Sequence, residues 1–305
     1  MLSTVEAETS LQPKVLQEFL QEQLPPAPPG SIFVGAGDGY AASWIASCLS
    51  SRKHMAVDPY ELAADPSPAK GRNVYFVSAS GRTASNLAAA EAVKGLARRR
   101  IAVTANPLGG IVEATDLAVF IPYRSVPRIP GTLSFSLSLL ALLKLVSGGV
   151  DCDFPRVYSM ADRDAAALRF SERGVTHFVG NGPAFPVGLY SALKVYEILG
   201  KRAECNMLEE FSHAPLFSLE KADAVNIFTA FDPLGIGQRL WSSLKSRGFR
   251  PSRIAPYGVN AQERVFYLVF MSQIGVLRRA RSSGAVRPYF LRAREKLAVS
   301  DAMIY

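Results

Sequence analysis

Residues 73–121 restrict the fold more than any other stretch, because strand and helix patterns alternate there without a break. Apolar β-prone runs at Val74–Val77, Ile101–Thr104 and Leu117–Ile121 predict strands, and an alanine-rich helix is expected at Ala84–Leu96 between the first two. This alternation is typical of parallel βαβ units with right-handed crossovers. The chain is therefore expected to be an α/β protein.

A second pattern occurs once in each half of the chain. SIFVGAGDGYAASWIASCL and THFVGNGPAFPVGLYSAL both read as a buried strand, a glycine-containing turn and a helix. The repeat predicts duplicated α/β domains. We expect an N-terminal helix and proline-rich linker over residues 1–29, a first domain over 30–150, and a second domain with a basic C-terminal tail over 151–305. GAGDGY lacks the third glycine of a dinucleotide fingerprint, so no dinucleotide site is predicted.

Composition excludes several classes of protein. The net charge of +8 attracts anions, but there is no nucleic-acid motif and no set of aromatics between the basic runs, so no nucleic acid is expected as a partner. The apolar run Leu133–Val146 holds three serines and a lysine, and it is too short and polar to span a membrane. The N-terminus lacks the apolar core of a signal peptide.

The three cysteines, Cys48, Cys152 and Cys205, are widely separated in the sequence. Their number and spacing indicate neither a disulfide framework nor a zinc site. This usage favours a reducing compartment, and a cytoplasmic protein is expected.

The loop SASGRT, Ser78–Thr83, joins the first strand of the alternating stretch to its helix. Three hydroxyls, a glycine and the free N–H groups of a helix start form a cradle for phosphate. The alternative is an ordinary Ser/Thr helix cap. Three hydroxyls at one turn favour anion binding.

The stretch Gly182–Leu216 holds a second group of candidate residues. Lys194 and Glu197 are three residues apart on a predicted helix and share one face, and His213 follows 16 residues later. A cation, a carboxylate and an imidazole are the groups that proton transfer on a sugar phosphate needs. The alternative is a solvated surface pair together with a histidine that caps a loop.

These motifs resemble a known family. SASGRT with the helix after it resembles the sugar isomerase (SIS) domain, whose hallmark loop is S-x-S-G-x-T, and GNGPAFPVGLYSALKVYEILG resembles the isomerase domain of glucosamine-6-phosphate synthase. The resemblance covers about residues 30–290 and implies two SIS domains in tandem. Each would be a parallel five-stranded flavodoxin-like sheet flanked by helices. The synthase's amidotransferase domain has no counterpart, so no glutamine-dependent activity is expected.

The resemblance also implies a set of phosphate contacts. The hydroxyls of Ser78, Ser80 and Thr83, with the backbone N–H groups of Ala79 and Gly81, would hold the sugar phosphate. The turn Gly37, Asp38 and Gly39 matches the family's C-G-T-S turn, with Asp38 and Gly39 in place of its hydroxyl residues.

The catalytic groups come from the second half in this resemblance. Glu197 would move a proton between C1 and C2, Lys194 would stand beside it, and His213 would open the sugar ring from the neighbouring subunit of a homodimer. The segment EFSHAP departs from the family's G-E-x-K-H-G-P, and Lys296 is the candidate for its C-terminal lysine.

The function expected is aldose–ketose isomerisation of a phosphorylated sugar, or isomerisation with deamination of an amino sugar phosphate such as glucosamine 6-phosphate. A partly buried glutamate with a raised pKa suits the proton shuttle. The reaction needs no metal or redox cofactor. The alternatives are a non-catalytic sugar-phosphate sensor and a phosphoglucose/phosphomannose isomerase, and the sequence does not identify the hexose.

Overall fold

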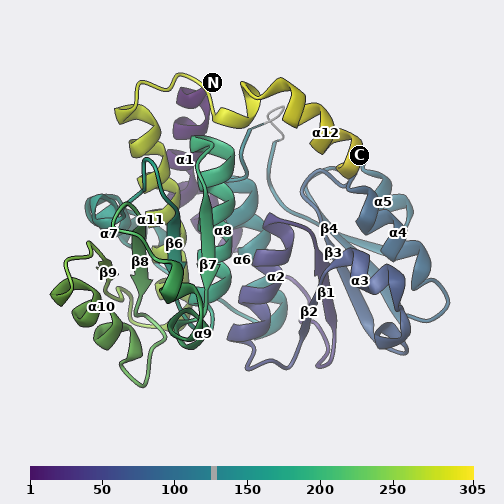
Figure 1. Ribbon diagram of the computed structural model, residues 1–305. Helices are drawn as coiled ribbons and strands as arrows, with labels where there is room; N and C mark the ends of the chain where they lie inside the picture. The colour runs from purple at the N-terminus through teal and green to yellow at the C-terminus, as the bar shows by residue number, and fades with distance from the viewer. Residues whose placement is uncertain (125–128) are drawn as a thin grey trace. The chain divides into compact units, whose positions relative to one another are not determined.

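The computed structural model describes residues 1–124 and 129–305 (Figure 1). They form two compact units, which we name by their sheets. The five-stranded unit comprises Leu11–Asp151 and Ala293–Tyr305, and the four-stranded unit comprises Met1–Ser10 and Cys152–Arg292. Residues 293–305, expected as a basic tail of the second half, therefore group with the first sheet and include a helix, α12 (Arg294–Ile304).

The five-stranded unit is built on a wholly parallel sheet with the strand order β2-β1-β3-β4-β5. This is the doubly wound order of flavodoxin-like folds, as the sequence predicts for the first half. Its strands are β1 (Ile32–Gly35), β2 (Met55–Val57), β3 (Asn73–Val77), β4 (Arg99–Thr104) and β5 (Leu117–Phe120).

Burial on both faces explains why the central strands β1, β3 and β4 read as continuous apolar runs. Every residue of β1 is buried, as are the last four residues of β3 and of β4, which is typical of a parallel sheet covered by helices. Ile32, Val34, Val74 and Phe76 form one core cluster with residues of the covering helices.

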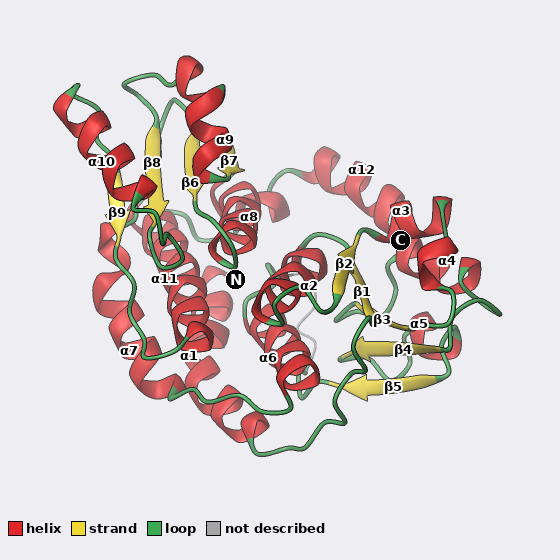
Figure 2. Cartoon of the chain, turned by 90° about the horizontal axis from the view of Figure 1, so that it is seen from below, coloured by secondary structure: helices red, strands yellow, loops and turns green. Residues whose placement is uncertain are grey.

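Helices cover this sheet and carry the chain between its strands (Figure 2). The predicted buried helix at Leu133–Val146 is confirmed as α6 (Leu133–Ser147), and 13 of its residues are buried. None of the helices in the described ranges is long and apolar enough to cross a membrane. The other helices of the unit are α2 (Asp38–Leu49), α3 (Pro59–Ala64), α4 (Ala84–Ala92) and α5 (Gly110–Glu113), and α1 (Leu2–Leu20) begins in the four-stranded unit and ends in this one.

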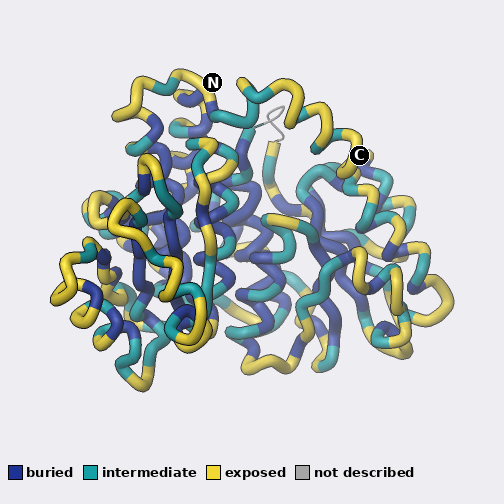
Figure 3. The backbone as a smooth tube through the Cα atoms, in the orientation of Figure 1, coloured by how far each residue is buried: buried dark blue, intermediate teal, exposed yellow. Residues whose placement is uncertain are grey.

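The second sheet has four parallel strands in the order β7-β6-β8-β9, so the expected five-stranded sheet is wrong for this unit. After the last strand the apolar residues recur at helical spacing, and Ala261–Ser282 forms the long helix α11, most of which is buried (Figure 3). Among the residues that the structure describes, no fifth strand joins this sheet. The strands are β6 (Thr176–Val179), β7 (Ala203–Asn206), β8 (Ala224–Phe228) and β9 (Ser252–Ile254).

The helices of the four-stranded unit include a π turn, η3 (Val195–Leu199), which extends α8 (Ala184–Lys194). α11 packs against α7, α8 and η3. The remaining α-helices are α7 (Phe154–Asp164), α9 (Leu208–His213) and α10 (Ile236–Ser246).

Lys144 of α6 is buried and completes the hydrogen bonds at the end of α1. Its Nζ donates to the carbonyl oxygens of Phe19 at 2.6 Å and Leu20 at 3.1 Å, and also to that of Glu22. The last carbonyls of a helix have no partner within the helix. The lysine inside the apolar helix α6 therefore donates hydrogen bonds to carbonyl oxygens at the end of α1.

We expect Lys144→Met to lower the free energy of unfolding by about 2–4 kcal/mol, because the carbonyl oxygens of Phe19, Leu20 and Glu22 each lose a charged donor. Urea denaturation followed by circular dichroism measures the loss. Lys14→Met, which removes a lysine with a 76% exposed side chain, serves as the control and should change stability little. Equal effects of the two substitutions would contradict the role given to Lys144.

Candidate functional site

The loop Ser78–Thr83 lies at the carboxyl end of β3, where ligands bind in open parallel sheets, and it leads into α4. The Ser78 hydroxyl lies 3.1 Å from the Thr83 hydroxyl and 3.5 Å from that of Ser80. The Gly81 N–H donates to the same Ser78 oxygen at 3.1 Å. The three hydroxyls therefore lie together on one turn of backbone.

Thr83 does not act as an ordinary helix cap. It occupies the N-cap position of α4, but its side chain makes no capping hydrogen bond. Its hydroxyl is instead turned toward Ser78. The first N–H groups of a helix carry a partial positive charge and attract anions. The helix-cap interpretation of this loop is thus wrong, and the start of α4 is left without a side-chain cap from Thr83.

Neighbouring residues fix the backbone of the loop. Gly81 has φ +65°, and a Cβ there would lie 3.0 Å from the Cα of Gly109, so a side chain is disfavoured by both conformation and space. The Asn106 side chain donates to the Ser80 carbonyl at 2.9 Å, and the Thr104 hydroxyl donates to that of Ala79 at 3.3 Å. The end of β4 therefore holds the loop in a single shape.

A cavity of about 210 Å³ lies beside this loop within the five-stranded unit. Ser78, Ala79, Ser80 and Thr83 line it, and so do residues at the start of α2. Its volume has room for a group the size of a sugar phosphate's anionic end together with several waters. The remaining lining residues are Ala36, Asp38, Gly39, Val77, Ser134, Phe135, Ser138 and Tyr305.

Six of these lining residues were not predicted, and three of the six carry a hydroxyl group. Ser134 and Ser138 come from α6, and Tyr305 follows α12. The two serines lie four residues apart on one helix face, so polar positions at helical spacing in an otherwise apolar helix were an available signal. Nothing in the local sequence marks Tyr305, because its place depends on the path of a distant segment.

Two glycines at the start of α2 have different structural roles. Gly39 needs to be glycine, because a Cβ there would lie 2.7 Å from the Val77 carbonyl oxygen. Gly37 is the N-cap of α2 with φ +53°, and it is not among the described residues that line the cavity.

Asp38 lines the cavity and has the one acidic side chain in that set. It adds negative charge where the loop offers neutral donors.

Lys194 and Glu197 form a close ion pair in the four-stranded unit. The Lys194 Nζ lies 2.6 Å from Glu197 Oε2; the lysine side chain is 0% exposed and the glutamate side chain 33%. The Lys194 ammonium also lies 5.1 Å from the centre of the Tyr190 ring, whose hydroxyl accepts a hydrogen bond from Gln273. The solvated surface pair is therefore the wrong interpretation of this spacing.

Glu197 lies on a π turn rather than on the regular helix that the sequence predicts. The N–H of Gly200 donates to the carbonyls of both Val195 and Tyr196 at 3.1 Å, and Gly200 has φ +67°. π turns inside helices occur frequently at functional sites. The turn keeps Glu197 beside the buried lysine and partly open to solvent.

His213 is not brought to this pair. It ends α9, its side chain is 71% exposed, and its Nε2 lies 3.2 Å from Glu209 Oε1. Lys296 lies on α12 and is not among the described residues that line the cavity in its unit, whereas Tyr305 is.

No protein-family model matches the sequence. The sequence is similar to glutamine–fructose-6-phosphate aminotransferases (isomerizing). It is 24% identical over 205 residues to that of Sulfolobus acidocaldarius, covering 62% of this chain and 35% of the relative. It is 29% identical over 162 residues to that of Escherichia coli K12, covering 46% and 27%. The chain thus spans about a third of the length of these relatives and is homologous to part of them.

Solved structures share its fold over nearly the whole chain. Glucosamine-6-phosphate deaminase from Thermotoga maritima matches with a TM-score of 0.74 and 21% identity, covering 93% of this chain and 95% of that one. Tagatose-6-phosphate ketose/aldose isomerase from Escherichia coli gives 0.73 and 16%, covering 94% and 96%. The C-terminal domain of the Francisella tularensis glucosamine-fructose-6-phosphate aminotransferase gives 0.69 and 17%, covering 90% and 96%. The α/β architecture with parallel sheets is confirmed.

We expect Glu197→Ala to lower the free energy of unfolding by about 2–4 kcal/mol, because it removes the carboxylate that pairs with a buried ammonium. Glu91→Ala is the matched control. Glu91 and Lys94 also form an i,i+3 pair, but both side chains are more than 60% exposed, so the cost should be below about 1 kcal/mol. Equal costs in urea denaturation would show that the Lys194–Glu197 pair behaves as a surface pair.

Proposed function

We propose that this chain binds a phosphorylated sugar or amino sugar and interconverts its aldose and ketose forms by proton transfer, releasing ammonia where the substrate carries an amino group. The cavity beside Ser78–Thr83 carries the proposal, since its hydroxyls and uncapped helix start match the needs of a phosphate group. Similarity to isomerizing aminotransferases and the fold shared with a phosphosugar isomerase and a deaminase add support.

Phosphate recognition in this proposal uses neutral donors. The hydroxyls of Ser78, Ser80 and Thr83 and the N–H group of Ala79 would surround the phosphate oxygens. The Gly81 N–H, expected from the sequence to share this role, instead donates to Ser78, and Gly81 is not among the described residues that line the cavity. Donors fixed by the backbone do not have to reorganise when the anion binds. The bracing of the loop by Thr104 and Asn106 fits this role.

Glu197 is proposed as the base of the reaction. Its carboxylate would take the proton from one of the two carbons C1 and C2 of the open-chain sugar and return it to the other, through an enediol. The Lys194 ammonium would hold the carboxylate in position and offset negative charge on the enediol oxygen. The 2.6 Å ion pair and the partial exposure of Glu197 support this assignment.

His213 is proposed as the acid that opens the sugar ring in a neighbouring copy of the chain. Its exposure and its distance in sequence from the pair fit a group that serves another subunit. The assembly would then be a homodimer of chains that each carry two SIS domains in tandem. The three free cysteines fit a cytoplasmic protein.

Asp38 bears on the choice between isomerase and deaminase. A carboxylate in the phosphate cavity repels a second anion and attracts an ammonium group. An amino sugar phosphate carries both charges. After the proton shift the amino sugar becomes an imine, and addition of water across its C=N bond releases ammonia and leaves the ketose phosphate. We therefore place glucosamine 6-phosphate first among the substrates to test.

The second candidate function is a sugar-phosphate sensor without catalysis. The segment EFSHAP, around an exposed His213 that pairs with Glu209, favours it. A sensor keeps the phosphate cavity but has no use for Glu197 as a base.

Incubation with glucosamine 6-phosphate should release ammonia and fructose 6-phosphate in equal amounts. Glu197→Gln should lower kcat by about 10²–10⁴-fold, the usual contribution of a general base, while binding persists. Glu91→Gln, with the same change in charge on an exposed helix, should retain full activity. Turnover that survives Glu197→Gln would remove Glu197 as the base, and binding without any turnover would support the sensor.

Ser80→Ala should weaken phosphosugar binding by about tenfold, because one good hydrogen bond to an anion is lost. The rise of melting temperature with ligand concentration measures this affinity. Ser67→Ala, at an exposed serine of the same unit, is the control and should bind as the wild type does. Unchanged affinity in Ser80→Ala would contradict the assigned phosphate site.

A further inference from the structure

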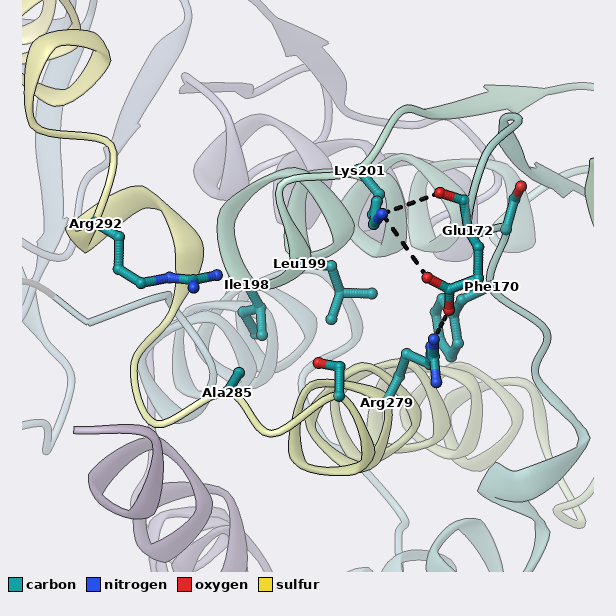
Figure 4. A pocket seen from close by; sticks show the side chains of 10 residues that line it. Phe170, Glu172, Ile198, Leu199, Lys201, Arg279, Ala285 and Arg292 are labelled. Atoms are coloured by element: carbon teal, nitrogen blue, oxygen red, sulfur yellow. Dashed lines mark hydrogen bonds and ion pairs between the residues drawn. The ribbon is translucent and has the colours of Figure 1, made fainter.

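A separate pocket lies in the four-stranded unit, between the loop before β6, the end of η3 and the end of α11 (Figure 4). Phe170, Ile198, Leu199 and Ala285 form its apolar wall. Its cavity volume is about 40 Å³, and the hollow around it, about 350 Å³ of empty space, opens to solvent. Of the residues that the structure describes, none lines both this pocket and the cavity beside Ser78.

The charged residues of this pocket give it an excess of positive charge. Lys201, Arg279 and Arg292 line it together with a single carboxylate, that of Glu172, so three cations face one anion. Glu172 pairs with Arg279 and lies 3.8 Å from the Lys201 ammonium. The charges of these four side chains sum to +2 in this pocket.

Arg292 supplies the cation that Glu172 does not engage. Its guanidinium lies 5.6 Å from the centre of the Tyr289 ring and points toward the pocket from the side opposite Glu172 (Figure 4). Among the described residues no carboxylate pairs with it. A planar guanidinium over an aromatic ring is well suited to bind a carboxylate with two hydrogen bonds.

We propose that this pocket binds a small organic anion, with its carboxylate on Arg292 and its apolar body against Phe170, Ile198 and Leu199. The cavity has room for an anionic group, and the hollow that opens to solvent accommodates the rest of the ligand. The Glu172 side chain is 56% exposed. Breaking its ion pair with Arg279 and hydrating its carboxylate therefore costs little free energy. Arg279 then adds unpaired positive charge on the side of the pocket opposite Arg292, which strengthens the attraction of the pocket for the anion.

The pocket is joined to the proposed base through the π turn. Ile198 and Leu199 line the pocket, and Glu197 precedes them on the same five-residue turn. The Tyr289 ring packs so closely on Gly200, the next residue, that a Cβ there would lie 2.3 Å from it. A ligand on this wall therefore shifts the position of Glu197 and alters kcat, a consequence that rests on the proposed function.

Benzoate is the probe, and methyl resonances of Ile198 and Leu199 in the ¹³C-labelled full chain report its binding without any catalytic assay. We expect these resonances to shift saturably with benzoate and not with benzyl alcohol, its neutral analogue. Arg292→Gln should weaken binding about tenfold, whereas Lys245→Gln, which removes an exposed cation over Trp241, should not. Equal affinity in the two variants, or shifts elsewhere only, overturns the site.

Glu172→Gln tests the exchange step, because it frees Arg279 and Lys201. Benzoate should bind this variant several-fold more tightly than the wild type, and Glu220→Gln, an equal change of charge at another exposed position, should leave affinity unchanged. Benzoate should also change the kcat of the wild type but not of Arg292→Gln. Benzoate that binds the pocket without changing kcat overturns the coupling to Glu197, and binding that is absent altogether overturns the site while leaving the proposed reaction untouched.

Discussion

The ion pair between Lys194 and Glu197 is the constraint on which the account of this molecule depends. The lysine side chain is fully buried and the glutamate side chain one-third exposed. The ammonium is therefore desolvated, while the carboxylate remains accessible to solvent. Such a pair is weak evidence of stability, because desolvation offsets much of the attraction between the charges. The pair matters for position, because a buried cation fixes the carboxylate on a π turn while one third of the glutamate side chain stays open to solvent.

The side chains of the loop after β3 are also held in an arrangement that is not the locally preferred one. A threonine at a helix start commonly caps the helix, yet the Thr83 hydroxyl turns toward Ser78 and leaves the capping bond unmade. Gly81 and Gly39 have close backbone neighbours that exclude a side chain. In each unit, the residues that the proposed reaction uses therefore depart from the locally preferred arrangement. Such departures are expected at functional sites.

Local patterns predicted the parts of the fold that local physics decides. The central strands β1, β3 and β4 of the first sheet follow from buried apolar runs, and the helix Leu133–Ser147 follows from its length and composition. The loop Ser78–Thr83 was recognisable because its residues adjoin in sequence. The fifth strand expected in the second sheet was wrong, since the segment after β9 has helical spacing. The burial of Lys194, the π turn and the place of Tyr305 depend on packing between distant segments, so no short stretch of sequence encodes them.

The proposed chemistry makes the proton on C2 of the sugar exchangeable, and this gives the most direct test. Glucosamine 6-phosphate incubated with the protein in D₂O should yield fructose 6-phosphate with deuterium at C1, detected by NMR, because the base exchanges its proton with solvent through the exposed side of Glu197. Glu197→Gln should abolish the incorporation. Deuterium incorporated by Glu197→Gln at the wild-type rate would contradict the account, since the proton would then move without this carboxylate.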